Sequence, residues 1–101
     1  MSIILTFECE KYQESTSLMV YENMKFSEVT SMFFKKMGPR LNPKYDVIMF
    51  VYNHKWIYYN SNETLIELNI KNNSRISVLI NPFDVGSAPL SVKNILENDI
   101  N

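Results

Sequence analysis

Thr64-Leu65-Ile66-Glu67-Leu68-Asn69-Ile70, followed five residues later by Arg75-Ile76-Ser77-Val78-Leu79-Ile80, is the stretch of this chain that decides its fold. The first run opens on a hydroxyl residue, continues with closely spaced hydrophobic residues, and predicts a short helical turn over residues 64–68. The second run alternates hydrophobic and polar residues and predicts a strand over residues 75–80. Together they form the last third of a small domain.

The first half of the chain contains a predicted hairpin and a predicted helix. Apolar and polar residues alternate over residues 3–10 and again over residues 16–22, and the short connection favours antiparallel pairing of these two strands. A helix over residues 24–37 is predicted to start at a cap formed by Asn23 or Ser27 and to stop at Gly38-Pro39. One face of this helix is apolar at helical spacing: Phe26, Val29, Phe33 and Met37.

Two more strands are predicted between the helix and the opening stretch. Residues 46–52 are apolar at nearly every position, which predicts a third strand with two apolar faces. Residues 56–59 form a short aromatic strand or extended segment, after a turn at residues 53–55.

Length and composition indicate one folded domain with a short tail. The chain has 101 residues, of which 46% are hydrophobic and 21% are charged, which are ordinary values for a globular domain. Asn81-Pro82 marks the end of the last strand, because proline cannot donate to a sheet ladder. We therefore expect a domain over residues 1–81 and a C-terminal tail over residues 82–101, in which Ser91 and the apolar residues after it have the spacing of a short helix.

Composition also disfavours several partners. A formal net charge of -1 gives no basic field for a nucleic acid. Since no apolar run approaches the roughly 20 residues that span a bilayer, we expect a soluble protein that does not bind membranes. Cys9 is the single cysteine, so the chain forms no internal disulfide, which fits the cytoplasm or the nucleus.

The sequence contains no catalytic or ligand-binding motif. Cys9 and His54 are the only candidates for a nucleophile and its base, and nothing in the sequence places them within hydrogen-bonding reach. The same two residues fall short of the ligand set of a zinc site, and Gly38 and Gly86 are too far apart to form a phosphate loop. We expect a protein that is not an enzyme and that uses no cofactor, no metal and no small-molecule substrate.

The order of the predicted elements resembles that of the ubiquitin-like, or β-grasp, family over residues 3–80. The resemblance implies an α+β fold in which a mixed sheet of four to five strands packs on one helix. It also implies a role in protein binding, although the fold serves adaptors, covalent modifiers and structural subunits. The matching core positions are Leu18, Val20, Phe26, Val29, Phe33, Leu65, Leu68, Ile70, Ile76, Val78 and Ile80.

The C-terminal diglycine of conjugated ubiquitin-like proteins is absent, and the matching positions hold Asp84, Val85 and Gly86. The expected function is a non-catalytic ubiquitin-like interaction module, either an adaptor or a domain of a larger protein. Two alternatives stay open. The tail is similar to that of the ubiquitin-fold modifier, which ends at Val-Gly, so a covalent modifier matured at Gly86 is one. A structural subunit of a stable complex, similar to elongin B, is the other.

The contact surface that the resemblance implies is the sheet face that points away from the helix. With a turn at Asn53, Met49 and Val51 are expected to point inward, and the predicted protein-binding residues point outward: Ile48, Phe50, Tyr52 and Leu79. One alternative is that apolar residues of the tail cover this face. Another is a shift of one residue in the third strand, which exchanges its two faces.

Trp56, Tyr58 and Tyr59 form a second predicted aromatic cluster. These side chains either anchor a partner or close the bottom of the core.

Overall fold

Five strands and one α-helix make up residues 1–81, the part of the chain that this computed structural model describes. The predicted order of strands and helix is confirmed. None of the helices in these residues is long and apolar enough to cross a membrane. In chain order the elements are β1 (Ser2–Cys9), the 3₁₀ helix η1 (Glu10–Tyr12), β2 (Glu14–Tyr21), α1 (Phe26–Met37), the 3₁₀ helix η2 (Gly38–Arg40), β3 (Ile48–Tyr52), β4 (Lys55–Ile57) and β5 (Ser74–Ile80).

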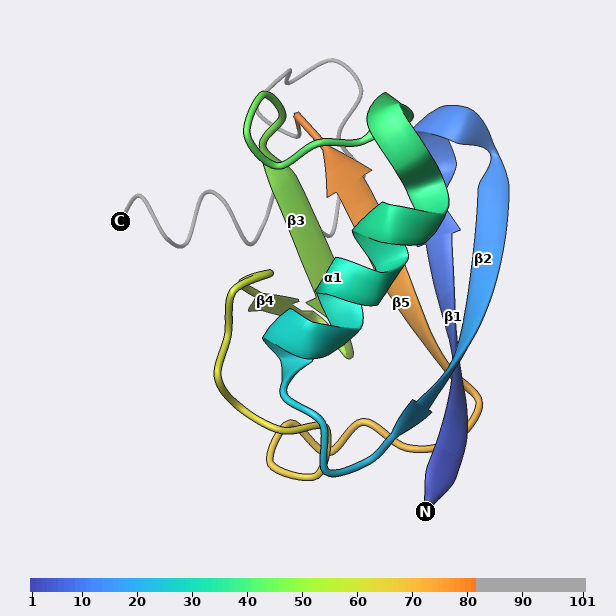
Figure 1. The fold of residues 1–101 in the computed structure, drawn as a ribbon, viewed down its shortest axis with the longest axis vertical. Helices are drawn as coiled ribbons and strands as arrows, with labels where there is room; N and C mark the ends of the chain where they lie inside the picture. Colours follow the sequence, from blue (N-terminus) through green and yellow to red (C-terminus); the bar gives the residue numbers. More distant parts are fainter. Residues whose placement is uncertain (82–101) are drawn as a thin grey trace.

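Strand β5 lies at the centre of the sheet, although it is the last strand of the domain. The strand order is β2-β1-β5-β3-β4. Strands β1 and β5 run parallel, with Phe7 opposite Ile76, and the other neighbouring strands run antiparallel. In Figure 1, α1 crosses in front of the sheet, with β1 and β2 to one side and β3 and β4 to the other. This arrangement is the predicted ubiquitin-like β-grasp fold.

Helix α1 begins two residues later than predicted and ends where predicted. Its N-cap is Lys25, whose backbone N–H donates to the Glu28 carboxylate at 3.0 Å. The predicted cap residues Asn23 and Ser27 do not serve this purpose. At the other end Gly38 has a φ of 70°, which a residue without a Cβ adopts at little cost, and its N–H donates to the carbonyl four residues earlier.

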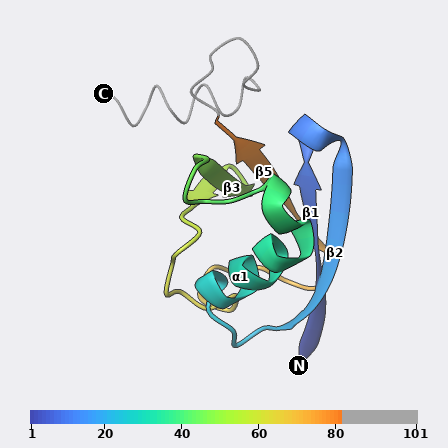
Figure 2. The same ribbon diagram turned by 45° about the horizontal axis from the view of Figure 1, so that its top comes forward.

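The core fills the space between α1 and the sheet. Phe50 lies at its centre, with its ring centroid 5.5 Å from that of Phe26 and 5.8 Å from those of Phe7 and Phe33, all in edge-to-face geometry. Such pairs add about 0.5–1.5 kcal/mol each beyond the burial of their surface. Figure 2 shows α1 against one face of the sheet. The predicted apolar face of the helix is confirmed, since all of its residues are buried: Phe26, Val29, Phe33 and Met37.

Residues 64–70 form the predicted turn. The Thr64 hydroxyl accepts from the Glu67 N–H at 3.2 Å, and the Glu67 carboxylate accepts from the Thr64 N–H at 3.0 Å, which is the reciprocal pair of a capping box. The Leu68 N–H donates to the Thr64 carbonyl at 3.0 Å, which closes one helical turn. Leu65 and Ile70 are buried, so both ends of the turn are packed on the core.

Candidate functional site

Strand β3 points its large side chains into the core, and the predicted outward orientation of Ile48, Phe50 and Tyr52 is wrong. Phe50 is 0% exposed and Ile48 is 6% exposed. Tyr52 is half-buried against the same core, and its hydroxyl lies 3.1 Å from the hydroxyl of Ser74. The β3 residues that were predicted to bind a partner therefore face α1. This orientation is the one expected from the alternative in which a shift of one residue exchanges the two faces of the strand.

Pairing with β5 determines which face of β3 is buried under α1. Phe50 lies opposite Val78, and Met49 lies opposite Leu79. Residues directly opposite each other in a sheet share a face, so Leu79, which points outward as predicted, has Met49 beside it. The sequence of β3 is apolar on both faces, so its own alternation does not distinguish them.

The sheet face opposite α1 is called the outer face below, and it carries two apolar areas. The first, the outer cluster, consists of Met49, Val51 and Leu79. Met49 is 0% exposed, Leu79 is 8% exposed and Val51 is half-buried. The outer cluster therefore presents little accessible surface.

The second apolar area, the β1–β2 patch, consists of Ile4, Met19 and Tyr21. Ile4 and Met19 are opposite each other in the register, and Tyr21 follows Met19 by two residues on the same face. Their side chains are 42%, 68% and 59% exposed, respectively. The alternation of both strands puts these side chains on the face opposite to the buried one, but sequence reasoning did not select them as binding residues. Apolar residues at the solvent-facing positions of an alternating strand are the signal that could have found them.

A groove of about 460 Å³ lies beside the outer cluster. Val51 and Leu79 line its apolar part, and Glu8 and Glu14 are among its polar residues. Both carboxylates already have partners within the domain, because Glu8 lies 3.5 Å from the Arg75 guanidinium and Glu14 is bound by a second arginine. Glu10 is a third carboxylate in the lining, so the groove carries negative charge that these two arginines do not neutralise.

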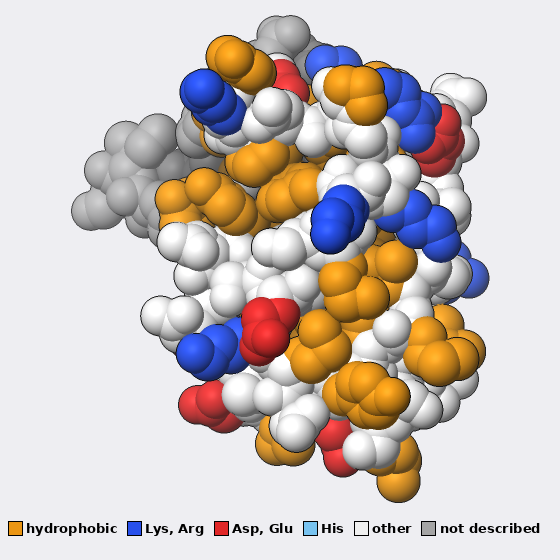
Figure 3. Space-filling model, in the orientation of Figure 1, with side chains coloured by type: hydrophobic (Ala, Val, Ile, Leu, Met, Phe, Trp, Pro, Cys, Tyr) orange, Lys and Arg blue, Asp and Glu red, His pale blue; other side chains and the backbone are white. Residues whose placement is uncertain are grey.

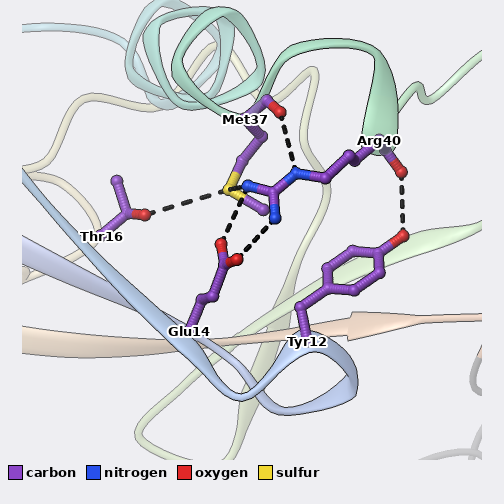
Figure 4. Close-up of polar contacts among 5 residues, drawn as sticks. All are labelled: Tyr12, Glu14, Thr16, Met37 and Arg40. Carbon is purple, nitrogen blue, oxygen red and sulfur yellow. Dashed lines mark hydrogen bonds and ion pairs between the residues drawn. The ribbon is translucent and has the colours of Figure 1, made fainter.

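The partner of Glu14 is Arg40, and the two residues clamp the β1–β2 connection to the end of α1 (Figure 4). The Arg40 guanidinium donates to both carboxylate oxygens of Glu14, at 2.5 and 2.9 Å. The Tyr12 hydroxyl donates to the Arg40 carbonyl at 2.9 Å, and the guanidinium lies over the Tyr12 ring. Hydrogen bonds from Arg40 hold the pKa of the Glu14 carboxyl below its usual range. The clamp has a structural role and was not predicted, because Glu14 and Arg40 are 26 residues apart.

Cys9 and His54 lie at opposite ends of the sheet. Cys9 is next to Val78, near the end of β5. His54 follows Tyr52, whose hydroxyl reaches Ser74 at the start of β5. Burial raises the pKa of the Cys9 thiol, which opposes formation of the thiolate that a nucleophile requires. Within residues 1–81 no group of three or more His, Cys, Asp or Glu side chains is arranged to hold a metal ion.

The aromatic residues after β3 divide between the core and the surface. Tyr59 packs against the core, with its ring 5.9 Å from that of Phe34, and its carbonyl accepts from the Thr30 hydroxyl at 2.7 Å. Trp56 and Tyr58 are 40% and 57% exposed. Tyr59 thus closes the core, and the other two side chains are accessible to a partner.

Several predictions fall on residues 82–101, which lie outside the described part of the chain. They are the tail with its short helix, the conjugation end at Gly86, and coverage of the outer face by the tail. All three stay predictions.

The solution structure of the UBL domain of yeast Ddi1 is similar to this chain. The TM-score is 0.64 at 18% sequence identity, and the match covers 78% of this chain and 88% of that chain. At this identity the likeness shows the fold, which is that of a ubiquitin-like domain. No family model matches the sequence, and no curated protein matches it.

Proposed function

We propose that this chain is a non-catalytic, ubiquitin-like interaction module that binds a protein partner through the outer face of its sheet. The observation that carries the proposal is the β1–β2 patch, in which Ile4, Met19 and Tyr21 are exposed together on the sheet face opposite α1. Contiguous exposed apolar patches on a folded domain mark interaction surfaces. Removing such surface from water is favourable by about 25 cal/mol per Å², and the surplus over the entropic costs of association appears as affinity.

The residue types of the patch also suit a protein interface. Tyr21 provides an aromatic ring with a hydroxyl, which is a common anchor in protein interfaces. Met19 has a flexible, polarizable side chain that adapts to the shape of its partner. Because Ile4 and Met19 lie opposite each other on adjacent strands, the patch is broad and shallow, and it fits an apolar helix or sheet face better than a small molecule.

The α1 side of the molecule has a different character. Figure 3 shows Lys and Arg side chains gathered over its upper half, where α1 ends, with hydrophobic groups set between polar atoms. Lys35 and Lys36 lie in the last turn of α1. Met32, on α1, is 37% exposed. It gives an exposed methionine on the opposite side of the molecule from Met19.

The experiment compares these two methionines in the full-length protein. A photo-crosslinking amino acid is placed at position 19 in one variant and at position 32 in another, and both are expressed in the native cells. We expect a discrete crosslinked protein from position 19. The purified partner should then bind the wild type, and Met19→Glu should lose most of that binding.

Met32→Glu is the matched control, since it makes the same change on the α1 side. It should leave the affinity unchanged. Loss of binding in Met32→Glu alone, or full binding by a folded Met19→Glu variant, would exclude the outer face as the binding surface.

A further inference from the structure

A groove of about 570 Å³ lies between the β3–β4 hairpin and the turn over residues 64–69. It is called the aromatic groove below, because Tyr52, Trp56 and Tyr58 line it. Figure 1 shows these segments at the lower left, on the edge of the sheet away from β1 and β2. The aromatic groove is therefore separate from the β1–β2 patch, and the proposed function does not use it.

The backbone of the hairpin determines where Trp56 lies. Asn53 and His54 both have positive φ values, 52° and 65°, as in a tight two-residue turn. Trp56 pairs with Val51, one position away from the pair that flanks this turn. Because hydrogen-bonded and non-hydrogen-bonded pairs alternate along an antiparallel ladder, the Trp56 N–H and C=O point away from β3, toward the open edge of β4. The aromatic groove thus has backbone donors and acceptors beside its aromatic rings.

The far side of the aromatic groove carries negative charge. Glu63 and Glu67 line it there, and Lys55 is the only cationic side chain among the described lining residues. Hydrogen bonds from the N–H and hydroxyl of Thr64 hold the pKa of the Glu67 carboxyl below its usual range. Glu67 is therefore ionised at neutral pH, and this side of the groove attracts a cationic side chain.

From these features we infer that the aromatic groove binds an extended, proline-containing segment of a partner protein, with a Lys or Arg of that segment beside Glu63 and Glu67. Proline-rich segments adopt the polyproline II conformation and dock in grooves lined by aromatic side chains. Their backbone carbonyls have no internal hydrogen bonds, so they accept donors from the groove. The indole N–H of Trp56 and the hydroxyl of Tyr58 are donors of the required kind.

A helical partner fits this groove less well. A helix satisfies its own carbonyls and presents an apolar stripe, which calls for an aliphatic groove. Among the described lining residues Leu68 and Ile57 are the only aliphatic ones, and the others are aromatic, amide, charged or, at Ser61, a hydroxyl.

The first experiment exposes the full-length protein to an array of decapeptides. Half of the peptides contain prolines at PxxP spacing with varied charge, and the other half are the same peptides with alanine in place of proline. We expect the bound peptides to be enriched in proline and in Lys or Arg. No enrichment in proline among them, or no binding at all, would overturn the inference.

The second experiment titrates the best peptide against the protein and follows the fluorescence of Trp56, the single tryptophan of the chain. We expect a saturable change. Tyr58→Ala should weaken binding about 2- to 10-fold through loss of ring stacking, and Glu63→Gln should weaken it by up to about 5-fold. Tyr45→Ala, at an exposed tyrosine outside the aromatic groove, should have no effect. Unchanged affinity in a folded Tyr58→Ala variant contradicts the assignment.

Discussion

Phe50 on β3 lies directly opposite Val78 on β5, and both side chains are fully covered on the α1 side of the sheet. This pair joins the two halves of the core, since β5 also pairs with β1. Phe50 therefore stabilises the fold and is not available to a partner. Substitutions on β3 can therefore separate the stabilisation of the fold from the binding of a partner.

Phe50→Ala should lower the free energy of unfolding by about 3–5 kcal/mol, because it removes a large side chain and leaves a cavity. Urea unfolding followed by circular dichroism measures this loss. Tyr45→Ala, at a tyrosine that is 77% exposed, is the control and should change stability by less than about 0.5 kcal/mol. Equal effects of the two substitutions would show that Phe50 does not occupy the core.

Glu14→Gln should lower the unfolding temperature at neutral pH, because it removes the charge that Arg40 binds. The folded-state pKa of Glu14 lies below its ordinary value of 4.5, so the stabilisation is fully present above that value and is lost as pH falls through the depressed pKa. Thermal unfolding from pH 7 to pH 2 should show the wild type and the variant converging in acid. The difference should also shrink in high salt.

Glu10→Gln is the control for this clamp, since Glu10 is an exposed glutamate in the adjoining η1 helix. Its stability should follow that of the wild type across the pH range. A Glu14→Gln deficit that persists undiminished at pH 2 would mean that the carboxylate charge is not its cause.

Thr64→Ala should destabilise the domain by about 1 kcal/mol, because the hydroxyl that accepts from the Glu67 N–H is lost. Thr64→Ser keeps the hydroxyl and should recover most of the loss. Chemical denaturation of the three proteins provides the comparison. If serine is no better than alanine, the threonine methyl group and not the cap supports this turn.

Cys9 should react slowly with a thiol reagent in the native protein, because it is buried and its pKa is raised by that burial. Mixing with the chromogenic disulfide reagent DTNB at pH 8, with and without denaturing urea, measures the two rates. A Cys9→Ser, Tyr45→Cys double variant should react at once without urea. Rapid native labelling of Cys9 would show that the end of β1 opens frequently.

The elements with a clear period could be predicted from the sequence. Helix α1 has one apolar stripe and a Gly38-Pro39 stop, and β1 alternates between buried and exposed positions. Each of these patterns therefore allows only one orientation of its element toward the core. The pattern of strand β3 allows two orientations, because both of its faces are apolar. Only its pairing with β5 distinguishes the two orientations, and the local sequence pattern does not determine how distant strands pair.

The candidate sites were harder to predict for the same reason. The β1–β2 patch and the aromatic groove each depend on which strands become neighbours. Ile4 and Met19 come from different strands, and the aromatic groove combines the β3–β4 hairpin with residues 63–69. Residue type alone identified Trp56 and Tyr58 as candidates, but their exposure follows from the position of β4 at the sheet edge.

The central position of β5 has a consequence for the synthesis of this protein on the ribosome. Before residues 74–80 emerge, the strand ladders available to the nascent chain are those of two separate hairpins, β1 with β2 and β3 with β4. The contacts that unite them span most of the domain, and such non-local contacts form slowly. The two hairpins of the nascent domain thus join into one sheet only after its last strand is translated, in a late step.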